Sequence, residues 1–329
     1  MQQSTLKKLS EVLGISISTV SRALKDHPDI SVATKTRVKE LAKAMEYEPN
    51  AYAVQLRTRQ SNVLGILVPS ITNLFYDSFI AAVEEEARAN GYSVLIMQSV
   101  DSAVVEAASL QIFRKNMVMG LFAAVTVETD DMSQFDKMEY MDIPVVFVDR
   151  VPEGDEYFKV SLADEEAAKM VADAIITAKK KKVLALFGHP NLSLTKLREE
   201  AFVYTFKTKA PQTELVIHHP DTLEPAFEIA LKELTDKKYD VVFCMGDLIL
   251  MGVMKAVHEL NLKVPDDISI ISISNGFIPT VYNPKITHVE TSGYKLGKLA
   301  FEQMMGRLKH QTVSENVCVA SSLVKGGSL

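Results

Sequence analysis

The segment TLKKLSEVLGISISTVSRALK, residues 5–25, decides how the first part of this chain folds. Its leucines recur at the three- and four-residue spacing of a helix that buries one face. These leucines are Leu6, Leu9 and Leu13. Thr5 is a suitable N-cap for this helix, and Ser16 is one for a second helix. Between them Gly14 adopts positive φ readily, so the pattern predicts two short helices joined by a tight turn.

The second helix has an inward and an outward face. Val20 and Leu24 lie one turn apart and are expected to point inward. The outward face then carries Ile17, Ser18, Ser21, Arg22 and Lys25. Such a pair of helices is typical of a helix-turn-helix, in which the second helix presents its first residues to the DNA major groove.

A third helix should complete this small domain. Pro28 interrupts the chain, and Ser31 is expected to cap a helix that runs through Met45. Its inward residues Val38, Leu41 and Met45 would close a three-helix core.

Charge is divided unevenly along the 329 residues. Residues 1–60 hold ten Lys and Arg against six Asp and Glu, a balance of 10 − 6 = +4, whereas the whole chain has −6. The remainder therefore carries −6 − 4 = −10. A basic head on an acidic body suggests that only the head contacts phosphate.

From residue 62 onward, apolar runs alternate with amphipathic helical patterns. The expected strands are 63–68, 92–97, 120–125, 144–149, 182–188, 215–219, 240–246 and 268–274. The expected helices are 76–90, 164–178, 195–209, 225–236 and 248–260. Strands that are apolar throughout are typical of parallel sheets covered on both faces, so the pattern predicts doubly wound α/β structure. The series is too long for one sheet, which favours two lobes and a ligand cleft at the carboxyl ends of their strands.

Several classes of protein lack support in the sequence. Phosphate-binding glycine loops and the common hydrolase and metalloprotease motifs are absent, so neither an enzyme nor a cofactor is expected. His218, His219 and Asp221 have no further ligand at metal spacing, so no metal is expected. Cys244 and Cys318 lie in strand-like runs and are expected to be buried free thiols. Without a membrane-length apolar run or a secretory signal, the chain is expected in the cytoplasm.

The chain resembles the lactose-repressor (LacI/GalR) family of bacterial transcription regulators. The matching pieces in the first part are LGISISTVSRAL, HPDISVATKTRV, YEPNAYAVQLRT and SNVLGILVPSITNLFY. Those in the body are VVFVDR, GHPNLSLTKLREEAF, GDLILMGVMKAVHELNLKVPDDISII and ITHVETSGYKLGKLAFEQM. They occur in order over essentially the whole chain. The resemblance implies an all-α helix-turn-helix head and a two-lobed α/β body like that of periplasmic sugar-binding proteins.

The resemblance implies which head residues contact DNA. Ile17, Ser18 and Arg22 occupy positions that read base edges, and Arg22 can make a bidentate contact to guanine. The positions that grip phosphates are Thr5, Ser16, Thr19, Ser21, Ser31, Thr34, Tyr47 and Asn50. Thr19 and Ser21 have an alternative reading as exposed helix residues without a contact.

Residues 50–56, NAYAVQL, resemble the hinge helix of the family. Asn50 is a good cap, and Ala53 and Leu56 share one face. A helix this short is marginal in water, so it would form when two copies pack on DNA. Leu56, with Ala53, would then contact bases in the minor groove and kink the duplex. The alternative is that Leu56 is a linker residue docked on the body.

The effector contacts also follow from the resemblance. They are Phe75, Tyr76, Thr126, Asp149, Arg198, Asp221, Asp247, Ser274 and Asn275. Phe75 and Tyr76 would stack on a ring, and Arg198 would donate to hydroxyl or carboxylate groups. Each has a plainer alternative: Phe75 as core, Asp149 as a partner of Arg150, and Asp247 as a helix cap. Many sugar-sensing members carry Asp where this chain has Ser274, so a sugar phosphate, an acidic sugar, another metabolite or a partner protein stays open.

These expectations define three regions and one function. Residues 1–48 would form the DNA-binding head, 49–61 the hinge, and 62–329 the effector-binding and dimerisation body. Its N-lobe would comprise about 62–160 and 290–320, and its C-lobe about 161–289 with a C-terminal strand. The expected protein is a homodimeric repressor that binds palindromic operator DNA under control of a small, carbohydrate-like effector, with the helix at 76–90 in the dimer face. The alternative is a solute-binding sensor without catalytic activity.

Overall fold

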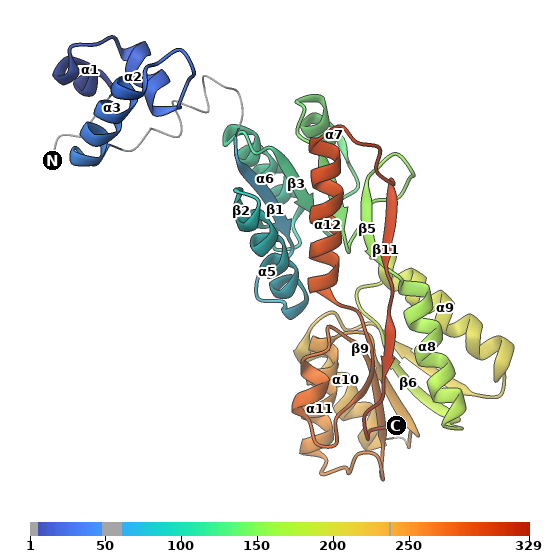
Figure 1. Cartoon of the computed structure of the whole chain (residues 1–329). Helices are drawn as coiled ribbons and strands as arrows, with labels where there is room; N and C mark the ends of the chain where they lie inside the picture. Colours follow the sequence, from blue (N-terminus) through green and yellow to red (C-terminus); the bar gives the residue numbers. More distant parts are fainter. Residues whose placement is uncertain (1–5, 48–60, 237) are drawn as a thin grey trace. The chain divides into compact units, whose positions relative to one another are not determined.

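The structure is a computed structural model that describes residues 6–47, 61–236 and 238–329. The chain divides into two compact units, Met1–Ser61 and Asn62–Leu329. The first unit, here called the head, contains the helices α1 (Leu6–Leu13), α2 (Ile17–Leu24) and α3 (Val32–Ala44). The second unit, the body, contains two α/β lobes (Figure 1).

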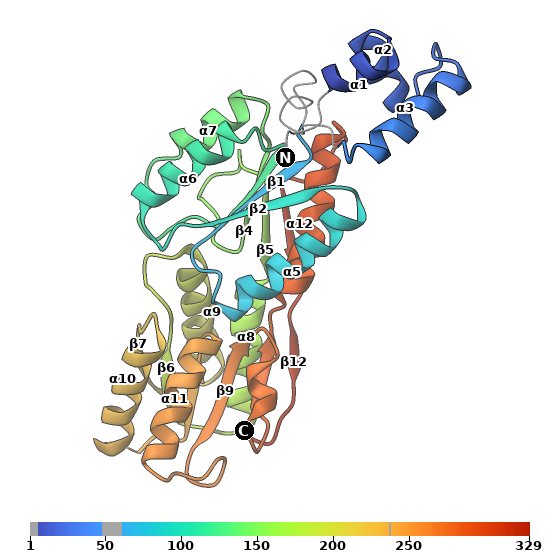
Figure 2. The ribbon, with the colours of Figure 1, turned by 90° about the vertical axis from the view of Figure 1, so that its left-hand side faces the viewer.

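The N-lobe of the body is built on a parallel six-stranded sheet. Its strands, in spatial order, are β11 (Asn316–Val319), β5 (Lys159–Leu162), β4 (Val145–Val148), β3 (Gly120–Ala123), β1 (Val63–Val68) and β2 (Ser93–Gln98). One face is covered by α5 (Leu74–Ala89) and α12 (Gly293–Leu308), which lie side by side in both views (Figures 1 and 2). The other face is covered by α6 (Ala103–Lys115) and α7 (Ser133–Tyr140).

The C-lobe repeats this plan. Its sheet runs β12 (Ser322–Val324), β10 (Thr287–Glu290), β9 (Ser269–Ser274), β8 (Val241–Cys244), β6 (Lys182–Leu186) and β7 (Glu214–His218). All neighbours are parallel except β10 and β12. The pairs α8 (Asp164–Thr177) with α9 (Ser193–Lys209), and α10 (Leu223–Asp236) with α11 (Asp247–Glu259), cover its two faces (Figures 1 and 2). A short 3-10 helix, η1 (Ile278–Val281), follows β9.

Within the described body the chain crosses between the lobes three times. The crossings lie between β5 and α8, between β10 and α12, and between β11 and β12. Each lobe therefore uses segments from two distant parts of the sequence. The three connections lie next to one another because β5, β10 and the last two strands occupy adjacent sheet edges.

The central strands are buried because helices cover both faces of each sheet. The residues of β3, β4, β8 and β9 are buried throughout, which confirms the doubly wound parallel sheets predicted from continuous apolar runs. Every strand and helix predicted from the apolar and amphipathic pattern of the body is present, with ends shifted by a few residues. The elements β5, β10, β11, β12, α6, α7 and α12 were not identified from hydrophobic periodicity.

The prediction that Cys318 is buried is wrong. Cys244 is buried, but Cys318 is exposed on β11. β11 is the edge strand of its sheet, and its residues alternate between half-buried and exposed. Val317 and Val319 pack against the core beneath α12, so Cys318 points to the opposite, uncovered side.

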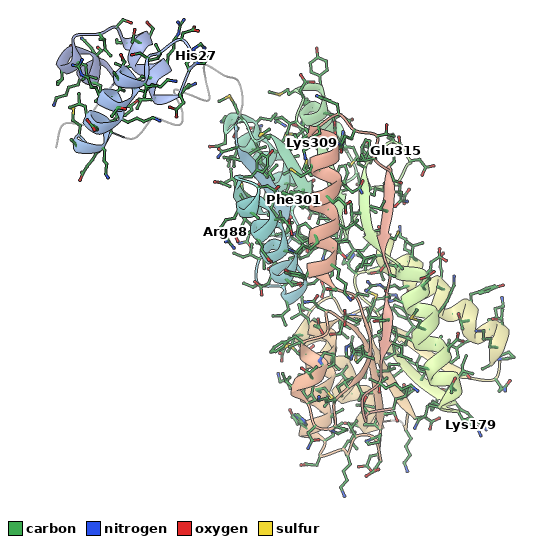
Figure 3. All side chains as sticks on the ribbon, in the orientation of Figure 1. His27, Arg88, Lys179, Phe301, Lys309 and Glu315 are labelled. Carbon is green, nitrogen blue, oxygen red and sulfur yellow. The ribbon has the colours of Figure 1, made fainter. Side chains whose placement is uncertain are left out.

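A run of lysines between α8 and β6 lies on the surface of the body. Lys179, at the end of α8, begins a run of four lysines (Figure 3). Lys179 and Lys181 are exposed, so the run is a solvated turn between α8 and β6. Within the described residues, none of the helices is long and apolar enough to cross a bilayer.

Candidate functional site

The three helices of the head share one small core. Leu9, Val20, Ala23 and Val38 have no exposed surface. Leu41, Met45 and other partly buried residues close this core around them. The predicted three-helix arrangement is therefore confirmed, and Ala23 is an inward residue that the sequence analysis did not identify.

Local capping fixes where the helices begin. Gly14 has φ +65, as the tight turn between α1 and α2 requires. The Ser16 Oγ accepts a hydrogen bond from the Thr19 N–H at 3.1 Å. In the same way Ser31 Oγ accepts from the Thr34 N–H at 3.3 Å. Both predicted caps are confirmed, and each holds a hydroxyl beside the N–H groups of a helix N-terminus, a favourable place for a phosphate.

The outward face of α2 offers three different chemical groups. Ile17 has 47% of its surface exposed, and Ser18 and Arg22 are exposed beside it. Ser18 Oγ is 2.7 Å from Ser16 Oγ, so the serine hydroxyls lie together at the start of the helix. An apolar group, a hydroxyl and a guanidinium on one face can contact a thymine methyl, a base edge and a guanine.

The other predicted DNA contacts fall into two groups. Thr19, Ser21, Thr34 and Tyr47 are partly buried, and Tyr47 packs against the head core. Thr5, Asn50, Ala53 and Leu56 lie outside the described residues.

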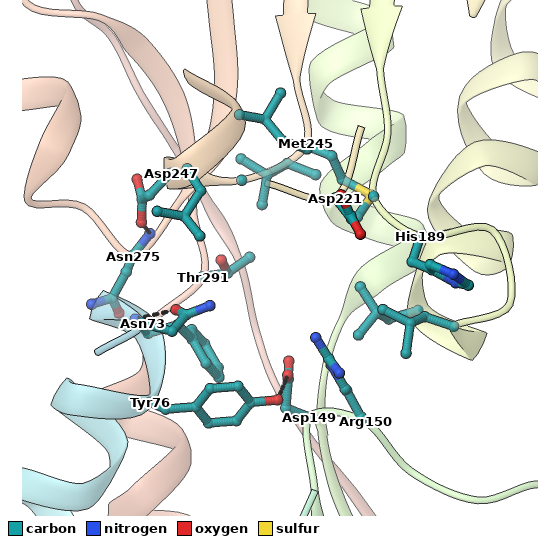
Figure 4. Close-up of a pocket in the computed structure, with 18 of the residues that line it drawn as sticks. Asn73, Tyr76, Asp149, Arg150, His189, Asp221, Met245, Asp247, Asn275 and Thr291 are labelled. Atoms are coloured by element: carbon teal, nitrogen blue, oxygen red, sulfur yellow. Dashed lines mark hydrogen bonds between the residues drawn. The ribbon is translucent and has the colours of Figure 1, made fainter. Parts of the chain in front are cut away.

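The body holds a cavity of about 350 Å³ lined by residues of both lobes (Figure 4). Its polar groups follow the carboxyl ends of parallel strands: Asp149 follows β4, His189 follows β6, and Asp247 follows β8. Parallel strands expose ligand-binding loops at this edge. The predicted effector residues that line the cavity are Phe75, Tyr76, Asp149, Arg198, Asp221, Asp247, Ser274 and Asn275.

On the N-lobe side a tyrosine and an aspartate form one unit. The Tyr76 hydroxyl donates to Asp149 Oδ2 at 2.6 Å, as the dashed line in Figure 4 marks. Burial raises the pKa of Tyr76, and the Asp149 charge raises it further. Burial also raises the pKa of Asp149. The Phe75 and Tyr76 rings meet edge to face, with centroids 5.5 Å apart. Phe75 is partly buried against the core and also lines the cavity.

Arg150 pairs with Asp101 rather than with its neighbour Asp149. Its Nη1 contacts the Asp101 Oδ1 in a short ion pair. Asp101 follows β2, and both residues line the cavity. The sequence analysis missed this pair, although the position of Asp101 after the predicted strand 92–97 was a signal.

All three guanidinium nitrogens of Arg198 contact other groups of the protein. Its Nε donates to Asp164 Oδ1 at 2.7 Å, and its Nη2 lies 2.6 Å from the same oxygen. Its Nη1 donates to the Met245 carbonyl oxygen at 3.2 Å. The side chains of Arg198 and Asp164 are each 7% exposed. The expected free guanidinium fork is therefore occupied, and Arg198 mainly joins α9, α8 and the end of β8.

The C-lobe side centres on Asp247. Its carboxylate accepts from the Ser274 hydroxyl and from the Asn275 N–H. Burial raises the pKa of Asp247. The alternative of Asp247 as a simple helix cap does not describe these contacts, because the carboxylate instead fixes the turn after β9.

Asn275 joins the lobes. Its Nδ2 donates to the Leu74 carbonyl oxygen at 3.2 Å. Its Oδ1 accepts from Ser78 Oγ at 3.2 Å and from the Gly293 N–H at 2.8 Å. Leu74 and Ser78 belong to α5 and Gly293 begins α12, so all three partners lie in N-lobe helices. These contacts occupy the amide that was expected to bind an effector.

Thr126 does not join the other predicted effector residues. It is buried outside the cavity lining, where its N–H donates to Thr129 Oγ1 at 3.0 Å and to Glu106 Oε2 at 3.3 Å. The expectation for Thr126 came from the family resemblance, but the loop after β3 folds back onto α6. The polar lining residues that sequence reasoning missed are Asn73, Asp101, Arg150, His189, Thr222 and Thr291.

Among the described residues no group of three or more His, Cys, Asp or Glu side chains is placed to hold a metal ion. His219, which the sequence placed in a short polar cluster, instead lies 2.6 Å from Glu199 Oε2.

Comparison with known proteins agrees with this two-part architecture. Residues 5–50 match the family described as bacterial regulatory proteins, lacI family. Residues 172–329 match the periplasmic binding protein-like domain. The ribose operon repressor of Bacillus subtilis is 29% identical over 314 residues, covering 95% of this chain and 94% of that protein.

The chain carries a helix-turn-helix domain of the lacI family and a periplasmic binding protein-like domain.

Further transcription regulators also match this chain. The transcriptional repressor PurR of Vibrio parahaemolyticus is 25% identical and covers 95% of both chains. The crystal structure of the lac repressor dimer bound to operator superposes with a TM-score of 0.87 at 20% identity, covering 99% of both chains. A regulator from Alkaliphilus metalliredigens complexed with D-xylulofuranose has a TM-score of 0.72 at 22% identity and covers 82% of this chain and 99% of its own. These structural matches show that the fold is shared.

Proposed function

We propose that this chain is a transcription repressor that binds a palindromic operator as a homodimer and responds to a small effector, a sugar or a sugar derivative. The observation that carries the proposal is the outward face of α2. Ile17 and Ser18 in the first turn of α2 and Arg22 in its last turn are exposed, and the three helices of the head form a closed core. Such a face reads the major groove in helix-turn-helix proteins. The curated relatives carry the name of repressor, which supports repression.

The effector is proposed to act from the cavity of the body. Residues of both lobes line it, so a ligand there contacts both lobes at once. The lobes are joined by three adjacent chain crossings and by the Asn275 contacts. A ligand that favours one lobe angle would change operator affinity through the hinge region, a coupling of about 1–3 kcal/mol in typical cases.

The dimer face is proposed on β2 and α6 rather than on α5. These elements and the loops that adjoin them carry exposed apolar side chains, namely Ile71, Ile96, Val100, Val104 and Ile112. The outer face of α5 carries Glu84, Glu85 and Arg88 instead. A second copy of the chain is the proposed occupant, since the lac repressor named above is a dimer on its operator. Val104, with 78% of its surface exposed, is a suitable probe: Val104→Asp should shift the sedimenting species from dimer to monomer.

Selection of operator sequences tests the proposal. The full chain is mixed with a pool of randomised palindromes, and bound DNA is recovered at low and at moderate salt. We expect one palindrome to be enriched and its affinity to fall as salt rises, because phosphate contacts release counterions. Arg22→Ala should weaken that binding and relax the preference for guanine at one position. Lys309→Ala, which removes an exposed charge after α12, is the matched control (Figure 3). A pool without enrichment contradicts the proposal.

The second candidate is a solute-binding sensor without catalytic activity, which the cavity alone would support. The two differ in the role of the head, so the selection above separates them. Binding of chromosomal DNA implies a cytoplasmic protein, and no cofactor or enzymatic activity is part of the proposal.

A further inference from the structure

The charges lining the cavity are unbalanced. Among the described lining residues, Asp101, Asp149, Asp221 and Asp247 are acidic, and Arg150 and Arg198 are basic. The two arginines are each committed to a carboxylate: Arg150 to Asp101, and Arg198 to the buried Asp164. The positive charge of the cavity is thus neutralised by the protein itself.

The remaining carboxylates differ in what they can still bind. Asp149 accepts the Tyr76 hydroxyl, and Asp247 accepts Ser274 and the Asn275 N–H. Asp221, at the start of α10, is exposed and points into the cavity (Figure 4). Within the part of the chain that the structure describes, no hydrogen bond or ion pair engages the Asp221 carboxylate. Its negative charge is available to a ligand.

The walls around these carboxylates are largely apolar. Phe75 lies on the N-lobe side, and Leu194, Met245 and Ile249 lie on the C-lobe side. Gly246 leaves open space, since a Cβ there would meet no atom within 4 Å. A ligand with an apolar ring or chain would displace water from these walls, and the Phe75 ring can pack against an apolar ring.

We propose that the cavity takes an organic ammonium compound, an aminated sugar or another ring amine, whose cationic nitrogen pairs with Asp221 while its body lies against Phe75, Leu194 and Met245. An anionic ligand would meet three carboxylates and no uncommitted cation among the described lining residues, so sugar phosphates and acidic sugars are disfavoured. The inference rests on the proposed function, in which this cavity is the effector site.

Three probes of similar shape and different charge test the inference. Benzylamine is cationic at neutral pH, benzyl alcohol is neutral and benzoate is anionic. Isothermal titration of the full chain should show benzylamine binding at least about tenfold more tightly than benzoate. Its affinity should fall with added salt, because an ion pair at an accessible carboxylate is screened.

Two variants locate the charge. Asp221→Asn should reduce benzylamine affinity to that of benzyl alcohol and leave the affinity for benzyl alcohol unchanged. Asp266→Asn is the matched control, because Asp266 is an exposed carboxylate that precedes β9 at the opposite end of the sheet. Equal or tighter binding of benzoate, no binding of benzylamine at millimolar concentration, or unchanged benzylamine affinity in Asp221→Asn would overturn the inference.

Operator selection with the same preparation keeps the two claims apart. A chain that enriches a palindrome but prefers benzoate overturns only the charge of the effector. A chain that prefers benzylamine but enriches no palindrome retains the cation site and loses the proposed function.

Discussion

Replacing Arg198 by alanine should destabilise the body more than it weakens any ligand contact. In the parent protein the side chain of Asp164 is only 7% exposed. The variant leaves its carboxylate without an ionic partner and leaves the Met245 carbonyl oxygen without its hydrogen-bond donor. Breaking a buried pair by removing one partner costs about 3–5 kcal/mol. With a slope of about 2 kcal/mol per molar urea, the unfolding midpoint of the body should fall by about 2 M. The chain contains no tryptophan, so far-ultraviolet circular dichroism is the suitable signal.

A double-mutant cycle separates the pair from the loss of packing. Arg198→Met retains much of the side-chain volume, and Asp164→Asn removes the charge without changing the size of the partner. The double variant should be more stable than the sum of the two single losses predicts, because neither charge is left buried alone.

The pH dependence gives a second check with a defined sign. Burial already raises the pKa of Asp164, and removal of the guanidinium removes the main opposing charge. A carboxyl with a folded-state pKa above its unfolded value stabilises the fold at low pH, and this stability is lost as the pH rises through that window. The cost of Arg198→Ala should therefore be larger at pH 8 than at pH 5. An unchanged midpoint, or a cost independent of pH, would refute the buried-pair reasoning.

Three further perturbations test other parts of the molecule. Leu56→Ala, a position outside the described residues, should weaken operator binding about tenfold with the dimer intact if its side chain wedges into the minor groove; unchanged affinity in a gel shift contradicts this. Asn275→Ala removes three interlobe hydrogen bonds and should cost about 1–3 kcal/mol, with faster amide hydrogen exchange at Gly293; unaltered exchange would show that the contact is not formed. Burial raises the pKa of Glu106, so the folded parent loses stability as that carboxyl deprotonates above about pH 4.3, the ordinary pKa of a glutamate. Glu106→Gln has no such loss, so its stability relative to the parent should increase as the pH rises. If the difference in unfolding midpoint between Glu106→Gln and the parent is the same at pH 5 and at pH 8, the raised pKa of Glu106 is contradicted.

Sequence patterns predicted those parts of the fold that are buried on both faces. The runs at β1, β8 and β9 are apolar because helices cover each side. β5, with the sequence KVSL, alternates between buried and half-buried residues beside the edge of its sheet. Its short mixed pattern carries too little periodicity to distinguish it from a loop.

The position of the cavity, at the carboxyl ends of the parallel strands, was also predicted from the sequence. Residues that follow parallel strands meet at one edge, which predicted a cleft there. The family resemblance, rather than the strand pattern, assigned Asp149, Asp247 and Ser274 to that cleft, and all three line the cavity. Pairings across the fold could not be placed in this way. Asp164 and Arg198 lie on different helices, 34 residues apart, and only the packing of α8 on α9 brings them into contact.

The repeated crossing of the chain between the lobes has a consequence for biosynthesis. The sheet of the N-lobe has received its strands through β5 by residue 162, but α12, whose buried Phe301 and Met304 cover one face of that sheet, begins at Gly293 (Figure 3). The ribosome must add 292 − 162 = 130 residues in between, which takes about 10 s at roughly 5–20 residues per second. During that time the nascent N-lobe exposes the apolar face that α12 later covers, so this face is a natural target for a chaperone. A premature stop codon before α12 would leave both lobes incomplete rather than yield one finished lobe.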